Sequence, residues 1–454
     1  FVDFIYLKSK SRTLCGFFNF SDSQYEKERI LMKNYSVETQ CVQAGYEPKS
    51  GEPRVAPIVQ STTYKYDDAD QVAALFDLSA VGHMYSRISN PTVEVLEKKL
   101  AVLEGGVGAL GVASGQSANF FAIFTLCSAG DNFICLSNLY GGTHTLFTST
   151  LKRMGIEATI LPCTIEPKEI SKYVNSKTKL LFAETLGNPG VEVLDIEAFA
   201  KAAHDNKLAF VVDNTFATPY LCRPIEHGAD IVTHSATKYL DGHATSIGGV
   251  IVDSGNFDWN NGNFDCLTQP DPAYHGLSYT EAFGNQAFIV KARASLLRDL
   301  GSTMSPNNAF LINLGTETLA LRMQRHSDNA LEVAKFLQSL DEVAWVNYPK
   351  LEGSKDYKLA EKYLPKGASG VISFGVKGGV DKAKLFINSV KLASLVVHVG
   401  DLRTHVLHPA SMTHRQLSEE QQIKAGIAPE MIRLSVGIEN PKDICDDLYQ
   451  ALKA

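Results

Sequence analysis

Three features that would assign a protein to a particular class are missing from this sequence of 454 residues. No run approaches the roughly 20 consecutive apolar residues of a membrane-spanning helix, so we expect no membrane span. Basic residues are not in excess, because 43 lysines and arginines against 50 aspartates and glutamates give a net charge of -7. Such a surface does not attract nucleic acid or anionic lipid, and we expect neither as a partner.

The third missing feature is a C-x-x-C pair among the eight cysteines. Scattered cysteines are typical of reduced thiols in the cytoplasm, not of disulfides or zinc ligands. Four histidines lie near one another in the sequence, namely His398, His405, His408 and His414. No thiol or carboxylate completes a convincing ligand set around them, so we predict a cytoplasmic protein without a metal site.

The N-terminal segment has the pattern of neither a secretory signal nor a transit peptide. It begins with Phe1 and has no clean apolar core and no small-residue cleavage site. Met32 opens a more typical start, "MKNYSVETQ". We interpret residues 1–31 as a non-native or disordered extension that contributes no chemistry.

From residue 90 onward, apolar runs alternate with segments of helical length. "NPTVEVLEKKLAVLEGG" predicts a helix that Asn90 caps, Pro91 opens and Gly105 ends. Four later runs show little alternation: "FICLS" (133–137), "KLLFAE" (179–184), "LAFVVD" (208–213) and "ADIVTHS" (229–235). Runs of this kind fit strands buried on both faces, so we predict an α/β fold with a mostly parallel sheet. After about residue 300 the pattern changes to that of a smaller α+β domain.

Polar side chains stand where three of these strands would end. The runs end at Glu184, Asp213 and Ser235, and the last is followed by Thr237 and Lys238. Ligands of open α/β sheets bind outside the carboxyl ends of the strands. We therefore expect two acids, two hydroxyls and one lysine to share a crevice.

A lysine beside hydroxyl groups and opposite a buried aspartate suits pyridoxal 5'-phosphate (PLP). The lysine can bind the aldehyde of PLP covalently, and the aspartate can pair with the protonated ring nitrogen. The segment "ASGQSANF" (113–120) adds a candidate phosphate site, because Gly115 and Gln116 lie between an apolar run and a helix. Backbone N–H groups at such a helix start are free to bind phosphate.

Six motifs together resemble the Cys/Met-metabolism family of PLP-dependent enzymes. They follow the order of that family: "YSRISNPT", "LYGGT", "VVDNTF", "SATKYLDGH", "HPASMTH" and "IRLSVGIE". The resemblance covers the chain from about residue 39 and implies the aspartate-aminotransferase-like fold, fold type I. It also implies an arm over residues 32–90 that reaches the neighbouring subunit, a large PLP-binding domain over 91–299 and a C-terminal domain over 300–454.

The resemblance gives roles to the residues around the cofactor by position. Lys238 matches the lysine that binds PLP, and Asp213 matches the partner of its ring nitrogen. Tyr140 matches the tyrosine that stacks on the ring, and Tyr140 and Lys238 are the candidates for moving protons. The phosphate cradle is matched by Gly115, Gln116, Ser235 and Thr237.

Tyr85 and Arg87 match residues that reach the phosphate of the neighbouring subunit. The resemblance therefore implies a homo-oligomer, at least a dimer, and by family likeness a tetramer built from dimers with shared active sites.

On the substrate side, Arg433 matches the arginine that grips the α-carboxylate, a task suited to a planar guanidinium. Asn188 and Glu184 match supporting residues near the ring and the substrate. His398 stands where lyases of the family tend to have serine, and its backbone is expected to lie near the substrate carboxylate.

Within the family, segment 267–330 resembles that of the O-acetylhomoserine sulfhydrylases. The expected reaction is γ-replacement, in which O-acetyl-L-homoserine and sulfide or a thiol give L-homocysteine or its thioether and acetate, in methionine and cysteine biosynthesis. Gly142 replaces the cysteine expected in a methionine γ-lyase, which argues against methionine as the substrate. A cystathionine γ-synthase, a C–S lyase, a PLP-binding protein without turnover and a succinyl donor stay open as alternatives.

Overall fold

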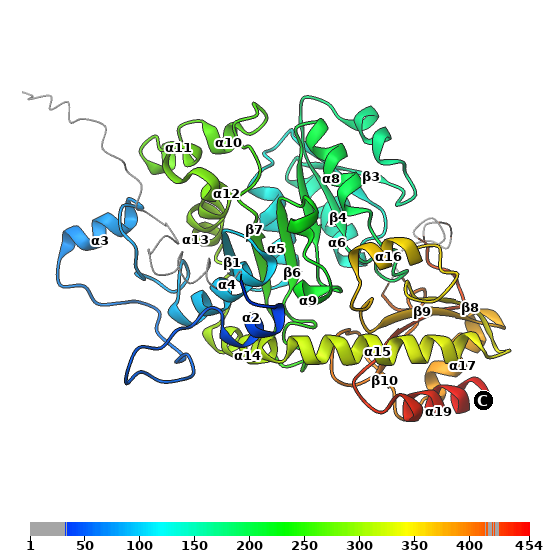
Figure 1. Cartoon of the computed structure of the whole chain (residues 1–454). Coiled ribbons are helices and arrows are strands. Elements are labelled where there is room, and N and C mark those ends of the chain that lie inside the picture. The colour runs from blue at the N-terminus through cyan, green and yellow to red at the C-terminus, as the bar shows by residue number, and fades with distance from the viewer. Residues whose placement is uncertain (1–31, 33, 414, 416–419, 421, 423–425) are drawn as a thin grey trace, which may run out of the picture.

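The structure, a computed structural model, describes residues 32, 34–413, 415, 420, 422 and 426–454. The predicted extension 1–31 lies outside the described residues. A seven-stranded sheet forms the centre of the molecule (Figure 1), with the strand order β1-β7-β6-β5-β4-β2-β3. Its strands are β1 (Gly108–Val112), β2 (Asn132–Leu136), β3 (Glu157–Leu161), β4 (Thr178–Glu184), β5 (Ala209–Asp213), β6 (Ile231–Ser235) and β7 (Gly249–Asp253).

This sheet is parallel from β3 to β6, and β7 is its one antiparallel strand among the described residues, inserted between β6 and β1. The prediction of a mostly parallel sheet is confirmed. The four runs predicted from the sequence are β2, β4, β5 and β6.

Both faces of the sheet are covered by apolar cores, which explains the lack of alternation in its strands. Leu180, Phe182 and Val211 point into one core. Their neighbours in the sequence, Leu181 and Val212, point into the other. Successive side chains of a strand face opposite sides of a sheet, so a strand with apolar residues at every position must be covered on both sides.

The helix predicted after residue 90 shows how the sequence sets its limits. Oδ1 of Asn90 accepts the backbone N–H of Thr92 at 2.9 Å, and Pro91 occupies the first helical position. Gly105 ends the helix with φ +83°, a conformation that favours glycine. The α-helices of the described residues are α2 (Val37–Gln43), α3 (Ala69–Phe76), α4 (Pro91–Glu104), α5 (Gly115–Phe124), α6 (Gly141–Thr145), α7 (Leu151–Arg153), α8 (Ile196–Asp205), α9 (Thr218–Leu221), α10 (Asp265–Thr268), α11 (Tyr279–Phe283), α12 (Ala287–Lys291), α13 (Arg298–Leu300), α14 (Pro306–Glu317), α15 (Leu319–Gln338), α16 (Tyr357–Tyr363), α17 (Gly379–Ser389) and α19 (Pro441–Leu452).

A second sheet of five strands follows in the C-terminal part, with the order β10-β11-β12-β9-β8. Its strands are β8 (Val343–Asn347), β9 (Val371–Val376), β10 (Ser394–Leu395), β11 (His405–Leu407) and β12 (Met431–Ser435). The long helix α15, yellow in Figure 1, extends from the region of the large sheet to the small one. Helices α17 and α19 pack against each other beside this sheet.

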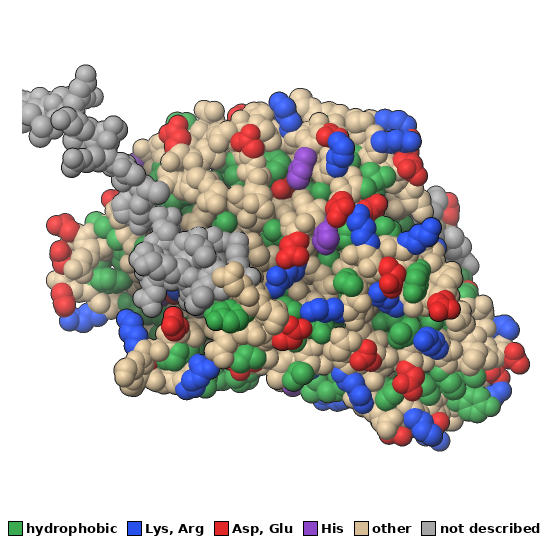
Figure 2. Space-filling view, in the orientation of Figure 1, with side chains coloured by type: hydrophobic (Ala, Val, Ile, Leu, Met, Phe, Trp, Pro, Cys, Tyr) green, Lys and Arg blue, Asp and Glu red, His purple; other side chains and the backbone are tan. Residues whose placement is uncertain are grey.

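Acidic and basic side chains are interspersed over the face of the molecule shown in Figure 2. Among the described residues, no helix combines the length and apolar character needed to cross a membrane.

Candidate active site

A pocket of about 220 Å³ opens at the carboxyl ends of β4, β5 and β6. Glu184 and Asp213 end the first two of these strands, Ser235 ends the third, and Lys238 follows three residues later. All four line the pocket. The structure thus brings together the polar strand ends that the sequence singled out.

The small sheet supplies the opposite wall of the pocket. Arg433 comes from β12, between β9 and β11, and His398 comes from the segment that joins β10 to β11. Both side chains line the same pocket as Lys238. The pocket therefore lies between the two sheets, which is why residues far apart in the sequence meet in it.

Among the predicted site residues, Tyr85 and Arg87 do not line this pocket. Tyr85 is 42% exposed, and the guanidinium carbon of Arg87 lies 4.8 Å from the centre of its ring. Thr63 pairs with Tyr85 in an isolated β-bridge that fixes the backbone there. Their expected role concerns a neighbouring subunit and stays a prediction.

Asp213 is held by hydrogen bonds at both carboxylate oxygens. Its Oδ1 accepts the backbone N–H of Thr215 at 3.0 Å and the hydroxyl of Thr215 at 2.5 Å. Its Oδ2 accepts Nδ2 of Asn119 at 3.2 Å, and Oδ1 of Asn119 accepts the hydroxyl of Thr233 at 2.6 Å. The carboxylate is therefore held directly by the turn after β5 and by α5, and β6 holds Asn119 in turn.

Sequence reasoning missed these supporting residues. Thr215 could have been found, because an aspartate often accepts the backbone N–H two positions later in a turn. No sequence signal points to Asn119, which lies 94 positions before Asp213 on helix α5.

The other end of the pocket is formed where α5 begins beside the end of β6. Ser114 caps the helix, its Oγ accepting the N–H of Ser117 at 3.2 Å. A Cβ added at Gly115 would stand 2.5 Å from Cβ of Ser235, so only glycine lets the helix start come this close to the strand. Backbone N–H groups, the helix dipole and the nearby hydroxyls together suit an anion such as phosphate.

Two further predicted residues brace this end. The hydroxyl of Thr237 donates to the carbonyl of Gly248 at 3.2 Å and accepts the N–H of Gly248 at 3.1 Å. Nε2 of Gln116 donates to the hydroxyl of Thr143 at 3.1 Å. The loop after β6 and the start of α5 are thus each tied to a second element.

Lys238 lines the pocket, and the pKa of its ammonium group is lowered. Burial, and secondly the positive charge of Arg433, lower the pKa of the Lys238 ammonium to about 8. Its Nζ lies 3.1 Å from Nδ1 of His398. A lysine with such a pKa has an appreciable neutral fraction near pH 8 and can act as a nucleophile or a base.

Arg433 is a buried cation, 6% exposed, without a carboxylate partner among the described residues. Its Nη1 donates to Oδ1 of Asn188 at 3.1 Å and its Nη2 donates to the carbonyl of His398 at 3.0 Å. Burial lowers its pKa to about 10, so it stays charged at neutral pH. A buried guanidinium held by neutral acceptors at the wall of a pocket is suited to bind an anionic ligand.

Glu184 and Tyr140 lie together on the remaining side. The backbone N–H of Tyr140 donates to Oε1 of Glu184 at 2.7 Å. Burial, and secondly the charge of Asp213, raise the pKa of Glu184 well above its usual range. The Tyr140 ring is 43% exposed, and a Cβ added at Gly142 would stand 2.5 Å from its Cε1.

The histidines near residue 400 have separate surroundings. Nε2 of His405 lies 3.2 Å from Oδ2 of Asp401, whereas His408 contacts Ser411 and the carbonyl of Pro429. His414 lies outside the described residues. Within the part of the chain that the structure describes, no group of three or more His, Cys, Asp and Glu side chains could hold a metal ion.

Comparisons with known proteins give consistent matches over nearly the whole chain. The family model of Cys/Met metabolism PLP-dependent enzymes matches residues 38–453. An O-acetyl-L-homoserine sulfhydrylase of Leptospira meyeri is 48% identical over 433 residues, which cover 93% of this chain and 98% of that protein. A homocysteine synthase of Schizosaccharomyces pombe is 47% identical over 420 residues, covering 92% of this chain and 98% of that protein.

A solved structure also matches over most of this chain. A Campylobacter jejuni protein described as a candidate O-acetylhomoserine (thiol)-lyase, which contains N'-pyridoxyl-lysine-5'-monophosphate, superposes with a TM-score of 0.90 at 39% identity. The match covers 92% of this chain and all of that chain, 100%. The predicted fold class is confirmed.

Proposed function

Because this chain belongs to the family of Cys/Met metabolism PLP-dependent enzymes, as predicted, we propose that it catalyses γ-replacement on O-acetyl-L-homoserine. O-Acetyl-L-homoserine and sulfide give L-homocysteine and acetate, and a thiol in place of sulfide gives the thioether. The names of the curated relatives and the match over nearly their whole length support this reaction.

The pocket fits PLP by the chemistry of its donors. Gly115 leaves room for an anion at the start of α5, and Ser235 and Thr237 place hydroxyls beside it. The hydrogen-bonded carboxylate of Asp213 would pair with the ring nitrogen, and Lys238, which lines the same pocket, would bind the aldehyde. When bound, PLP supplies an electron sink for the charge that develops at the α-carbon of an amino acid.

The residues of this chain then have distinct tasks. Arg433 binds the α-carboxylate of the substrate with its two terminal nitrogens. Lys238 takes the proton from the α-carbon, and Tyr140, at the mouth of the pocket, is the second candidate for moving protons between carbon atoms. Acetate leaves from the γ-carbon, and sulfide adds to that carbon.

One observation carries the assignment to an amino acid substrate: Arg433 is buried and has no carboxylate partner among the described residues, yet it lines the pocket that contains Lys238. A buried charge that the protein leaves without a counterion is costly unless a ligand supplies one. The substrate carboxylate would be that counterion.

The test is a substrate panel with parallel measurement of acetate, ammonia and homocysteine. With O-acetylhomoserine, we expect acetate and homocysteine to appear together and only when sulfide is present. O-Succinylhomoserine, cystathionine and methionine serve as the competing substrates. Release of ammonia from cystathionine or methionine at a higher rate would assign the chain to the lyases instead.

The proposal also includes a shared active site. Tyr85 and Arg87 are exposed and lie outside the pocket of their own chain, which supports a role at the phosphate of a neighbouring subunit. We propose a homo-oligomer, a tetramer built from two dimers with shared active sites. In each chain, residues 32–90 form the arm, 91–299 the PLP-binding domain and 300–454 the C-terminal domain. A cytoplasmic location, suggested by the scattered cysteines of the sequence, is part of the same proposal.

A further inference from the structure

The segment between β10 and β11 is pressed against the loop that contains Lys238. Gly400 has φ +79°, and a Cβ at this position would stand 2.8 Å from the backbone nitrogen of Tyr239. The backbone N–H of Leu402 donates to the carbonyl of Gly242 at 3.1 Å. The segment is therefore fixed to the Lys238 loop at two points, one directly after the lysine and one four residues later.

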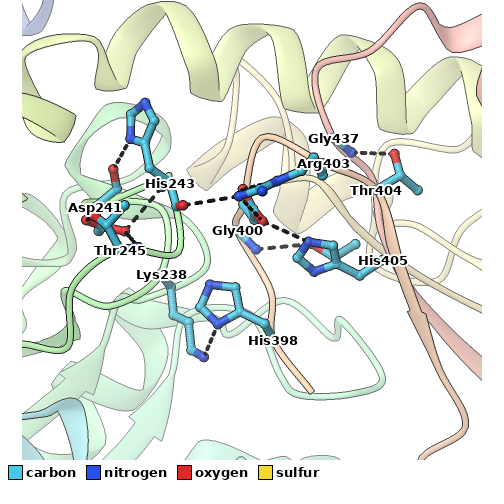
Figure 3. A network of polar contacts seen from close by, with 12 residues as sticks. Lys238, Asp241, His243, Thr245, His398, Gly400, Arg403, Thr404, His405 and Gly437 are labelled. Atoms are coloured by element: carbon cyan, nitrogen blue, oxygen red, sulfur yellow. Dashed lines mark hydrogen bonds and ion pairs between the residues drawn. The ribbon is translucent and has the colours of Figure 1, made fainter. Parts of the chain in front are cut away.

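This fixation places the imidazole of His398 against the lysine. Figure 3 shows the two side chains pointing toward each other from different loops, with Nζ of Lys238 3.1 Å from Nδ1 of His398. The backbone carbonyl of His398 meanwhile accepts Nη2 of Arg433 at 3.0 Å. The ring of His398 therefore contacts Lys238, and its backbone carbonyl contacts Arg433.

The imidazole is suited to accept a hydrogen bond and not to take the proton. Burial, and secondly the charge of Lys238, lower the pKa of His398 to about 4, so the ring is neutral at neutral pH. A neutral imidazole has one acceptor nitrogen and one donor nitrogen. With Nδ1 accepting from Lys238, Nε2 carries the hydrogen; it is buried and has no partner among the described residues.

Other ionisable groups also face the lysine and are part of its electrostatic surroundings. The groups that line the same pocket are Arg433 from β12, Asp213 from β5, Glu184 from β4 and Tyr140 directly before α6. The centre of the His405 ring lies 5.9 Å from that of His398, and His405 contacts Asp401, which pairs with Arg403. Among the described residues, none of these groups forms a hydrogen bond with Nζ of Lys238. Replacing His398 therefore removes the side-chain hydrogen bond of Nζ and leaves these groups in place.

We propose that His398 is a positioning residue, whose imidazole accepts a hydrogen bond from the Lys238 amino group whenever that group is not bound to the cofactor. One N–H is then fixed, and the lone pair of the nitrogen is left to face the pocket. An amine that takes a proton from carbon must present its lone pair along the bond that breaks, so this restraint favours proton transfer. The inference rests on the proposed function because it requires Lys238 to be the cofactor lysine.

The test compares His398→Leu, which has no acceptor, with His398→Asn, which is similar in size and keeps one. Each variant is freed of cofactor and mixed with PLP over a range of pH. The rate of covalent attachment at Lys238 is followed by visible absorbance and by mass after borohydride reduction. Attachment requires the neutral amine, so the midpoint of the pH profile reports the pKa of Lys238.

We expect a wild-type midpoint near the pKa of about 8 that burial gives Lys238. A hydrogen bond to the ammonium favours the charged form, so its loss lowers the pKa. In His398→Leu the midpoint should fall by about one unit, which corresponds to about 1.4 kcal/mol. In His398→Asn the midpoint of the pH profile should equal that of the wild type. His243→Asn is the matched control. His243 is an exposed histidine of the Lys238 loop that hydrogen-bonds to the carbonyl of Asp241 and does not contact Lys238.

A second readout separates positioning from substrate binding. The backbone carbonyl that holds Arg433 is unchanged in both variants, so His398→Leu should lower kcat and leave KM for O-acetylhomoserine unchanged. Equal midpoints for the Leu and Asn variants, in protein with the wild-type melting temperature, would overturn the inference. If Leu does not fold, His398→Ala takes its place. A wild-type protein that forms no linkage at Lys238 overturns the proposed function itself, a result that cannot be confused with an absent shift.

Discussion

Replacing Arg433 by alanine probes the substrate half of the site most directly. The guanidinium is 6% exposed and its hydrogen bonds go to Oδ1 of Asn188 and the carbonyl of His398, so its charge is free for a ligand. Truncating one partner of a buried, hydrogen-bonded charge pair costs about 2–5 kcal/mol. Since each 1.36 kcal/mol is a factor of ten in rate, kcat/KM should fall by roughly 30- to 5000-fold.

The assay measures sulfide-dependent homocysteine formation from O-acetylhomoserine and from its α-carboxamide. The carboxamide removes the charge from the substrate instead of from the protein, so the loss caused by Arg433→Ala should be much smaller with it. Arg433→Lys keeps the charge but not the two-pronged geometry and should give an intermediate loss. If Arg433→Ala costs the same factor with both substrates, the arginine does not bind the carboxylate.

A pH profile gives an independent check on the same variant. The charge of Arg433 contributes to lowering the pKa of Lys238 to about 8. Without that charge, the pKa of Lys238 should rise toward its usual value, and cofactor attachment should reach half its maximal rate at a higher pH. An unchanged or lower midpoint would contradict the electrostatic coupling across the pocket.

Four further predictions test other parts of the site and the fold. Lys238→Ala should lose both turnover and the linkage trapped by borohydride, and an active variant would refute its role. Mixing it with Arg87→Ala should restore part of the activity; no recovery at proven subunit exchange would exclude a shared site. Gly142→Cys should lower kcat, because a Cβ there would stand 2.5 Å from Cε1 of Tyr140. Burial lowers the pKa of His326 from 6.5 to about 4, so the folded protein binds fewer protons than the unfolded chain in that range. The free energy of unfolding in urea should therefore fall as the pH drops from about 6.5 to 4, and less so in His326→Asn.

The strands that carry the site could be predicted because their sequences follow simple rules. β4 and β5 contain apolar runs that are buried on both faces, β6 begins with Ile231 and Val232, and a polar residue marks the end of each strand. The helix after Asn90 has a cap, a proline and a terminal glycine that each act locally. Such signals do not depend on the rest of the chain, and the structure agrees with them.

Other elements gave weaker signals for physical reasons. β3 is an edge strand whose residues Glu157–Leu161 are mostly part-exposed, so no apolar run marks it. β7 begins with the second of two adjacent glycines, Gly249, and is antiparallel, which a strand–helix–strand pattern does not predict. Short apolar runs beside glycine are ambiguous until their pairing partners are known.

Contacts between distant segments were beyond the reach of the sequence. The carboxylate of Asp213 depends on Asn119, and the imidazole of His398 reaches Lys238 across 160 positions. Both contacts arise from the packing of helices and loops. No sequence pattern around Asn119 or His398 predicts which residue it contacts. The likeness to a family predicts roles for Lys238 and Asp213 but does not predict which residues orient them.

Because the pocket is divided between two sheets, the distance between Lys238 and Arg433 depends on how the two sheets are held together. The groups suited to the cofactor, Asp213 and Lys238, belong to the large sheet, whereas Arg433 belongs to the small one. A shift of one sheet against the other would therefore change the distance between the lysine and the bound carboxylate. His398 contacts both cations, by its ring and by its carbonyl, and its segment is fixed to the Lys238 loop at Tyr239 and Gly242. The contacts of the His398 segment with the Lys238 loop would therefore hold the proposed base, Lys238, at a set distance from the proposed carboxylate site, Arg433.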